Sequence, residues 1–308
     1  MKTSRPEQKP SQPLAGLLYS ASAFLIWGIS PVYWKALKSV PAYEIILHRV
    51  VWSFAFLILL IVCRHRWHEF LSFIQTKKVL AIMTVTALLV SCNWLVYIWA
   101  VNNGFLLQAS LGYYINPLVN VLLGFVFLKE RLRRYQRVAV ILAGAGVLYL
   151  TIFYGQFPWI ALTLAGSFGL YGLIRKVAPV GSLVGLAIET LLLTIPSILW
   201  LVYLDRNGSG SFLNSRIQIT FLLMGASVVT ALPLLLFNLG AKRVTLATLG
   251  FMQYIAPSCM FVTAVFIFHE PFLHAQLISF VMIWAALAVY SFDSVIVYRK
   301  HERLNATH

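Results

Sequence analysis

The stretch "YINPLVNVLLGFVFLKE", from Tyr114 to Glu130, has the same pattern as "YIAPSCMFVTAVFIFHE", from Tyr254 to Glu270. Each copy begins with Tyr-Ile, has a proline at its fourth position and ends with Glu after an apolar run. An upstream "ASLG" at 109–112 pairs with "ATLG" at 247–250 if a two-residue gap is allowed. The repeat is faint, but it indicates that the chain contains two related halves.

The composition indicates what surrounds these halves. Of the 308 residues, 60% are hydrophobic and 11% are charged, and the mean hydropathy is +0.82. Such a chain has too little polar surface to stay dispersed in water. The net charge of +15 is compatible with a nucleic-acid partner, but the basic residues are scattered between apolar runs and do not cluster. We therefore predict a protein of the lipid bilayer with no nucleic-acid partner.

Windows of about 20 residues, the length that an α-helix needs to cross a bilayer, identify the membrane spans. The apolar windows are 14–37, 43–63, 79–102, 108–128, 136–154, 157–174, 182–204, 217–240, 246–268 and 274–298. Most are too long for strands and lack a period of two, so helices are expected. The first window is too long for the core of a signal peptide, and we interpret it as a retained span.

Lysine and arginine in alternate loops predict the orientation. One side has only Lys35, Lys38, Arg206 and Arg216. The other side has Lys2, Arg5, Lys9, Arg64, Arg66, Lys77, Lys78, Lys129, Arg131, Arg133, Arg134, Arg137, Arg175, Lys176, Lys242, Arg243, Arg299, Lys300 and Arg303. The basic side is expected to face the cytoplasm, with both termini on that side.

The two copies of the repeat fall in the fourth and ninth spans. Five spans separate them, and an odd number of crossings reverses direction. We therefore predict an all-α membrane protein with ten transmembrane helices in two inverted five-helix repeats, an arrangement common in secondary transporters. The repeats are expected at 14–154 and 155–298, with cytoplasmic tails at 1–13 and 299–308.

Seven motifs, in one order from the first span to the last, carry a resemblance to a known family. They are "FLIWGISPVYWKAL", "PAYEIILHRVVWSF", "NWLVYIWAVNN", "ASLGYYINPLVNVLLG", "GLIRKV", "IETLLL" and "LGFMQYIAP". The chain resembles the EamA branch of the drug/metabolite transporter superfamily. The resemblance implies a ten-helix transporter in a bacterial inner membrane that exports or equilibrates small metabolites such as amino acids. One member is labelled a chloramphenicol-sensitivity protein.

Ionisable residues inside spans are costly, so they tend to face a bundle interior or a wet cavity. The second span contains Glu44, His48 and Arg49, and the seventh contains Glu189. Our hypothesis is that Arg49 binds an anionic or carboxylate-bearing substrate, while Glu189 binds its amine or a coupling proton. The alternative is that Arg49 pairs with Glu189 or Glu44 and only holds helices together.

Polar and aromatic residues offer stacking surfaces and directional hydrogen bonds for an amphipathic solute. We predict that a substrate site includes, together with Glu44, His48, Arg49 and Glu189, the residues Trp27, Asn93, Trp94, Tyr97, Tyr113, Tyr114, Asn116, Gln253 and Tyr254. Taken singly, each aromatic ring is more typical of lipid contact or core packing. Trp34 and Lys35 are interpreted as an interfacial anchor and a snorkelling side chain.

Prolines within spans remove a backbone donor and bend a helix. Pro31, Pro117 and Pro257 are therefore predicted hinges. The alternative for Pro117 and Pro257 is a kink that serves packing alone. Small residues in "LAGAGVL" and "LAGSFGLYGL" favour close helix contacts or a dimer face, so a monomer and a homodimer both stay open.

One stretch resembles an enzyme motif. "HEPFLH", from His269 to His274, differs from a zinc-binding HExxH because its histidines are five apart and Pro271 interrupts the turn. No Walker loop, GxSxG or dinucleotide fingerprint occurs, and the three cysteines lack metal or disulfide spacing. We expect no enzyme activity, cofactor or metal. The prediction is an inner-membrane secondary transporter that exports a small metabolite by alternating access, with or without protons carried by Glu44, His48 or Glu189. An uncoupled, channel-like facilitator is the alternative.

Overall fold

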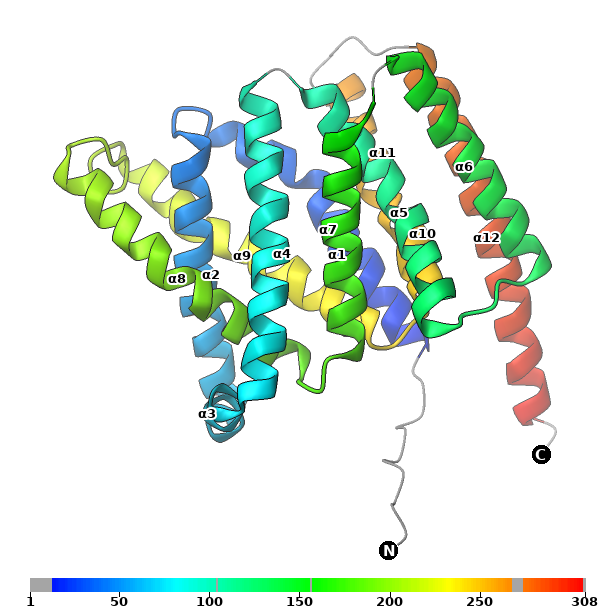
Figure 1. Cartoon of the computed structure of the whole chain (residues 1–308), viewed down its shortest axis with the longest axis horizontal. Coiled ribbons are helices and arrows are strands. Elements are labelled where there is room, and N and C mark those ends of the chain that lie inside the picture. The colour runs from blue at the N-terminus through cyan, green and yellow to red at the C-terminus, as the bar shows by residue number, and fades with distance from the viewer. Residues whose placement is uncertain (1–12, 104, 156, 268–273, 307–308) are drawn as a thin grey trace, which may run out of the picture.

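The computed structural model describes residues 13–103, 105–155, 157–267 and 274–306, and every regular element in these ranges is a helix (Figure 1). The elements are α1 (Pro13–Ala36), α2 (Ala42–Cys63), α3 (Trp67–Gln75), α4 (Lys77–Asn102), α5 (Leu106–Leu128), α6 (Arg134–Tyr154), α7 (Trp159–Val177), α8 (Ser182–Arg206), α9 (Ile217–Ala241), α10 (Leu246–Gln253), α11 (Ile255–Val262), η1 (Thr263–Ile267) and α12 (His274–Ala306). The prediction of an all-α protein is confirmed.

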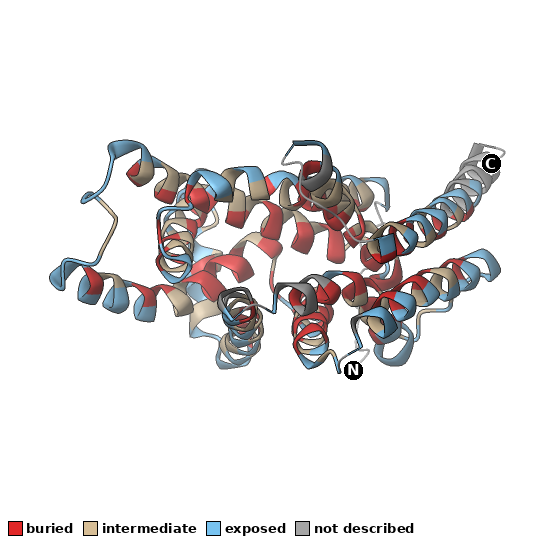
Figure 2. Ribbon diagram, turned by 90° about the horizontal axis from the view of Figure 1, so that it is seen from above, coloured by how far each residue is buried: buried red, intermediate tan, exposed pale blue. Residues whose placement is uncertain are grey.

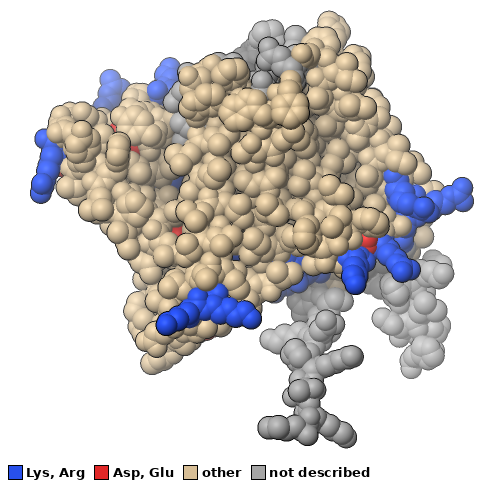
Figure 3. Space-filling model, in the orientation of Figure 1, with Lys and Arg blue, Asp and Glu red and all other residues tan. Residues whose placement is uncertain are grey.

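The outer surface of the bundle is apolar. Within the described ranges, nine helices are long and apolar enough to cross a membrane. Large side chains such as Leu88, Phe127 and Ile152 point outward and are more than half exposed. Lys and Arg gather along the lower rim and the right-hand side, with a smaller group at the upper left, and leave a broad apolar band between them (Figure 3). This surface is suited to contact with lipid, because an apolar side chain is as favourable in hydrocarbon as in the protein interior.

The predicted ninth span, 246–268, is not one helix. It is divided into α10, α11 and the π-helix η1, with the break at Tyr254. Pro257 has no N–H to donate to the carbonyl of Gln253, four residues earlier, which explains why the α-helical hydrogen bonding fails there. By contrast, Pro31 and Pro117 lie within continuous helices.

Two segments read as polar loops or tails are helical. Residues 67–75, between the second and third spans, form the short helix α3, and Arg66 and Glu69 pair at its start with nitrogen to oxygen distances of 2.5 Å. Helix α12 continues to Ala306, so most of the predicted tail 299–308 extends the last span. Residues 1–12 of the other predicted tail lie outside the described ranges.

Helix pairs from the two halves form the core, and small residues let them approach. α5 packs on α7 and α10, α1 packs on α9 and α11, and α6 packs on α12 at one side of the bundle (Figures 1 and 2). A Cβ atom on Gly250 of α10 would lie 2.6 Å from the Pro117 carbonyl oxygen of α5. Helices α5 and α10 therefore cross at a point where only glycine fits.

Candidate functional site

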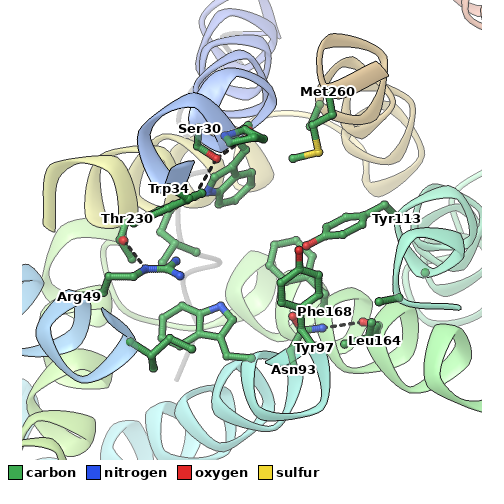
Figure 4. Close-up of a pocket in the computed structure, with 18 of the residues that line it drawn as sticks. Ser30, Trp34, Arg49, Asn93, Tyr97, Tyr113, Leu164, Phe168, Thr230 and Met260 are labelled. Atoms are coloured by element: carbon green, nitrogen blue, oxygen red, sulfur yellow. Dashed lines mark hydrogen bonds between the residues drawn. The ribbon is translucent and has the colours of Figure 1, made fainter. Parts of the chain in front are cut away.

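A cavity of about 530 Å³ lies between helices of both halves (Figure 4). Its volume is within the range of pockets that bind small molecules. It is lined by Phe24, Trp27, Ser30, Pro31, Trp34, Lys35, Ala42, Ile45, Ile46, Arg49, Asn93, Trp94, Tyr97, Ala109, Gly112, Tyr113, Asn116, Leu164, Phe168, Thr230, Leu234, Gln253, Ala256 and Met260. Its walls are mainly aromatic and aliphatic, with a few polar groups.

The cavity lies toward one face of the bundle. It extends to Lys35 and Ala42, which are exposed where α1 ends and α2 begins. Toward the opposite face, hydrogen bonds between buried side chains join α5 to α10 and α7 to α9. Asn120 donates to Gln253 at 2.5 Å, and Asn238 donates to the Tyr171 hydroxyl at 3.0 Å. The bundle is therefore packed on one side of the cavity and hollow on the other.

Arg49 is a charged residue in the wall of this cavity. Its Nε donates to the hydroxyl of Thr230 at 2.8 Å. Its guanidinium carbon lies 4.7 Å from the ring centroid of Trp34 and 5.2 Å from that of Trp94 (Figure 4). Both distances are typical of cation–π contacts. The structure thus positions Arg49 with a hydroxyl and two indole rings, and not with Glu44 or Glu189.

Glu189 does not line the cavity. Its Oε1 lies 3.6 Å from Arg175 Nε and accepts a hydrogen bond from Thr86 at 2.5 Å, while its Oε2 accepts one from Tyr171 at 3.3 Å. Glu189 and Arg175 are both fully buried or nearly so. The sequence predicts Arg175 in a cytoplasmic loop, but α7 continues to Val177 and carries this guanidinium into the core.

Glu44 and His48 also lie outside the cavity. The Glu44 carboxylate accepts hydrogen bonds from the backbone N–H of Ser211 at 2.6 Å and from its hydroxyl at 2.9 Å. His48 Nε2 is 3.8 Å from Glu44 Oε1, and its ring lies 4.9 Å from that of Phe212. These contacts attach the segment between α8 and α9 to the start of α2.

The two repeat tyrosines contact each other. The Tyr254 hydroxyl donates to the backbone carbonyl of Tyr114 at 3.2 Å, and the Tyr114 ring packs edge-on against Phe280. Neither tyrosine lines the cavity, and neither do Pro117 and Pro257. The predicted residues that do line it are Trp27, Pro31, Arg49, Asn93, Trp94, Tyr97, Tyr113, Asn116 and Gln253.

Sequence reasoning missed some of the cavity wall. Trp34 and Lys35, interpreted as lipid-interface residues, both line the cavity, as do Phe168, Thr230 and Met260. Spacing could have identified Trp34, because residues 27, 31 and 34 share one face of a helix. Residues 269–273 of the "HEPFLH" stretch lie outside the described ranges.

These features define a multi-pass helical membrane protein with an internal cavity. Comparison with known proteins specifies its family: residues 14–152 match the EamA-like transporter family. The Escherichia coli K12 protein RarD is 43% identical over 92% of this chain and 96% of its own length. The chain belongs to the EamA-like transporter family and is RarD-like, as its motifs predict.

Other relatives cover the same length. An uncharacterized transporter of Vibrio cholerae is 45% identical over 94% of this chain and 95% of its own. The chloramphenicol-sensitive protein RarD of Pseudomonas aeruginosa is 30% identical over 94% of this chain and 97% of its own. A crystal structure with 18% sequence identity superposes with a TM-score of 0.72 over 93% of this chain and 99% of that chain, so the two share a fold.

Proposed function

We propose that this protein is a secondary transporter that exports a small metabolite across the bacterial inner membrane by alternating access. The observation that carries the proposal is the cavity, which is built from both halves, reaches one face and is closed toward the other. A protein that alternates between two faces must have such a state. The family relationship supports transport, and not catalysis, as its activity.

Ten crossings in two inverted repeats agree with the contacts. Counting α10, α11 and η1 as one crossing adds a tenth to the nine long helices. A two-fold axis that relates the halves exchanges α1 with α7 and α4 with α9, so the contact of α1 with α9 corresponds to that of α7 with α4. The same axis exchanges the two members of the pairs α2 with α8 and α6 with α12, which also pack together. We take each set of five helices as one repeat.

The cytoplasmic side is proposed from the charge distribution. α1 begins and α12 ends at the lower side of Figure 1, near the main group of basic residues. The positive-inside rule places that side in the cytoplasm. The cavity then opens outward in this state, because it extends to the opposite end of α1.

The closed side is held by a reciprocal pair of lysines. Lys176 donates to the carbonyl oxygens of Ala241, at 3.0 Å, and Val244. Lys242 donates to those of Ala178, at 2.9 Å, and Val180, at 2.6 Å. Each lysine thus binds carbonyls near the C-terminal end of the other helix, α7 or α9. In an exporter, these contacts break when the cavity opens to the cytoplasm.

An uncoupled facilitator is the second candidate. Among the described residues that line the cavity there is no carboxylate to carry a coupling proton. Movement down a gradient or by exchange needs no such group. A pH gradient imposed on proteoliposomes discriminates the two. Only a proton-coupled transporter uses the proton gradient to move solute against the solute's own concentration gradient.

Cells that express cavity variants test export. Ile46→Trp fills the cavity with an indole ring, whereas Leu88→Trp places the same ring on the outer surface of α4. Untargeted mass spectrometry of the medium should find a metabolite that accumulates with the wild type and with Leu88→Trp but not with Ile46→Trp. Identical media from all three strains, with equal protein in the membrane, would contradict export.

Chloramphenicol is a further test solute because one relative carries it in its name. We propose that expression of this protein changes the susceptibility of the cells to this drug. Equal growth inhibition with and without the protein would remove that link and leave the export proposal intact.

A further inference from the structure

The described lining of the cavity carries positive charge and no negative charge. Arg49 and Lys35 both line it, and no Asp or Glu does. The two acidic residues that the sequence predicts inside the membrane have partners outside the cavity. Glu44 is bound by Ser211 and Glu189 by Arg175. A solute in the cavity therefore meets basic side chains and, among the described lining residues, no carboxylate.

Arg49 has unused hydrogen-bonding capacity. Thr230 accepts from Nε, and no hydrogen bond from the two terminal nitrogens, Nη1 and Nη2, exists within the described residues. These nitrogens turn toward the open centre of the cavity (Figure 4). Two N–H groups in one plane match the two oxygens of a carboxylate, and a charge away from bulk water gains most when it is paired.

The rings around Arg49 restrict how a ligand can approach. The guanidinium carbon lies 4.7 Å from the ring centroid of Trp34 and 5.2 Å from that of Trp94. An anion therefore approaches the edge of the guanidinium and not its faces. Beyond it, Trp27, Tyr97, Tyr113 and Phe168 provide further aromatic walls. Flat apolar groups stack well against such walls.

From these observations we infer that the cavity selects organic anions, with a carboxylate bound by Arg49 and a flat apolar body stacked on the aromatic walls. A zwitterion gains less, because no carboxylate among the described lining residues receives its ammonium group. This replaces the hypothesis that Glu189 binds an amine. The inference deepens the proposed transport function and rests on it for the movement of the ligand.

A series of probes with one body and three charges tests the inference. Benzoate, benzamide and benzylamine form one series, and indole-3-acetate, indole-3-acetamide and tryptamine form another. Binding to the full chain in lipid nanodiscs is measured by calorimetry. The affinity of each anion should be at least about 10-fold higher than that of its amide, as expected for a charge-assisted hydrogen-bonded pair. The amine should bind most weakly. Equal affinities within both series, or no measurable binding of either anion, would overturn the inference.

Variants assign the preference to Arg49. Arg49→Gln should reduce the anion-to-amide ratio to about 1, and Arg49→Lys should retain part of it. Arg243→Gln is the matched control, because Arg243 lies 5.2 Å from the Tyr19 ring and outside the cavity lining. An unchanged ratio in Arg49→Gln would contradict the assignment. If Arg49→Gln does not fold, Thr230→Val keeps the guanidinium. This variant should weaken the binding of the anion and leave that of the amide unchanged.

Uptake into proteoliposomes distinguishes this inference from the proposed function. Anion-selective binding without movement of any probe would contradict transport and leave the anion site in place. Movement of all three charge forms at equal rates would contradict the anion site and leave transport in place.

Discussion

Arg175 and Glu189 form an ion pair in the protein core, with 3.6 Å between Nε and Oε1. Arg175 also donates to the backbone carbonyl of Ser182 at 3.0 Å, and Thr86 and Tyr171 donate to the carboxylate. Helices α4, α7 and α8 meet at this pair. The sequence predicts a topological role for Arg175 and a binding role for Glu189. In the structure the charges of these two residues neutralise each other.

Removal of one partner should destabilise the protein. Arg175→Met leaves Glu189 buried without its counter-ion and should lower the free energy of unfolding by about 3–5 kcal/mol. The double variant Arg175→Met/Glu189→Gln should lose less than the sum of the single changes. Denaturant titration in detergent measures all three, and strictly additive losses would show that the two residues do not interact.

Glu130 should stabilise the closed side of the cavity. Its carboxylate accepts hydrogen bonds from the backbone N–H groups of Leu246 at 2.8 Å and Ala247 at 3.1 Å, at the start of α10. Glu130→Gln should cost about 0.5–2 kcal/mol of unfolding free energy, as for a helix cap. Glu69→Gln is the control, since it breaks a partly exposed pair with Arg66 worth about 0–1 kcal/mol. A larger loss for Glu69→Gln, measured by thermal unfolding, would refute this role.

Gly250 should be required at the crossing of α5 and α10. Gly250→Ala places a Cβ atom 2.6 Å from the Pro117 carbonyl oxygen and should cost about 1–3 kcal/mol by overpacking. Gly166→Ala in α7 meets no atom within 4 Å and should be neutral or stabilise the helix by up to about 1 kcal/mol. Melting temperatures of the two variants in one detergent provide the comparison. Equal effects would mean that the crossing yields to accommodate the methyl group.

Lys242 should make stability depend on pH. It follows α9, outside the membrane spans, and burial, reinforced by the positive charge of Arg175, lowers its pKa from 10.5 to about 8. Between these values the unfolded chain binds more protons than the folded chain, so stability should rise as pH increases from 8 to 10.5. Lys242→Gln should remove this rise from the melting temperature. A slope that is unchanged in the variant would exclude Lys242 as its source.

Hydropathy predicted most helix positions because it depends on local composition. Runs of about 20 apolar residues must form helices in lipid, where no water satisfies the backbone. The exceptions have local causes as well: the break at Tyr254 follows from Pro257, and α3 is too short for a span-length window. Those windows identify where a helix crosses and not which side of it faces inward.

The cavity was predicted in part. Trp27, Trp94 and Tyr97 were predicted as a mixed polar and aromatic set, and all three line it. Glu44 and Glu189 were predicted because charge inside a span is costly, but that cost is met equally by a structural partner. Spacing along one helix contains no information about a partner on another.

Composition, hydropathy and motifs were enough to predict a helical membrane protein of the EamA family. Only the tertiary structure decided that Arg49 faces Trp34, Trp94 and Thr230 while Glu189 faces Arg175. The physical reason is that these helices are apolar on every side, toward lipid as well as toward one another. Such helices lack the polar outer face that indicates rotation in a water-soluble bundle. Close packing between helices fixes their rotation, and with it the residues that share the cavity.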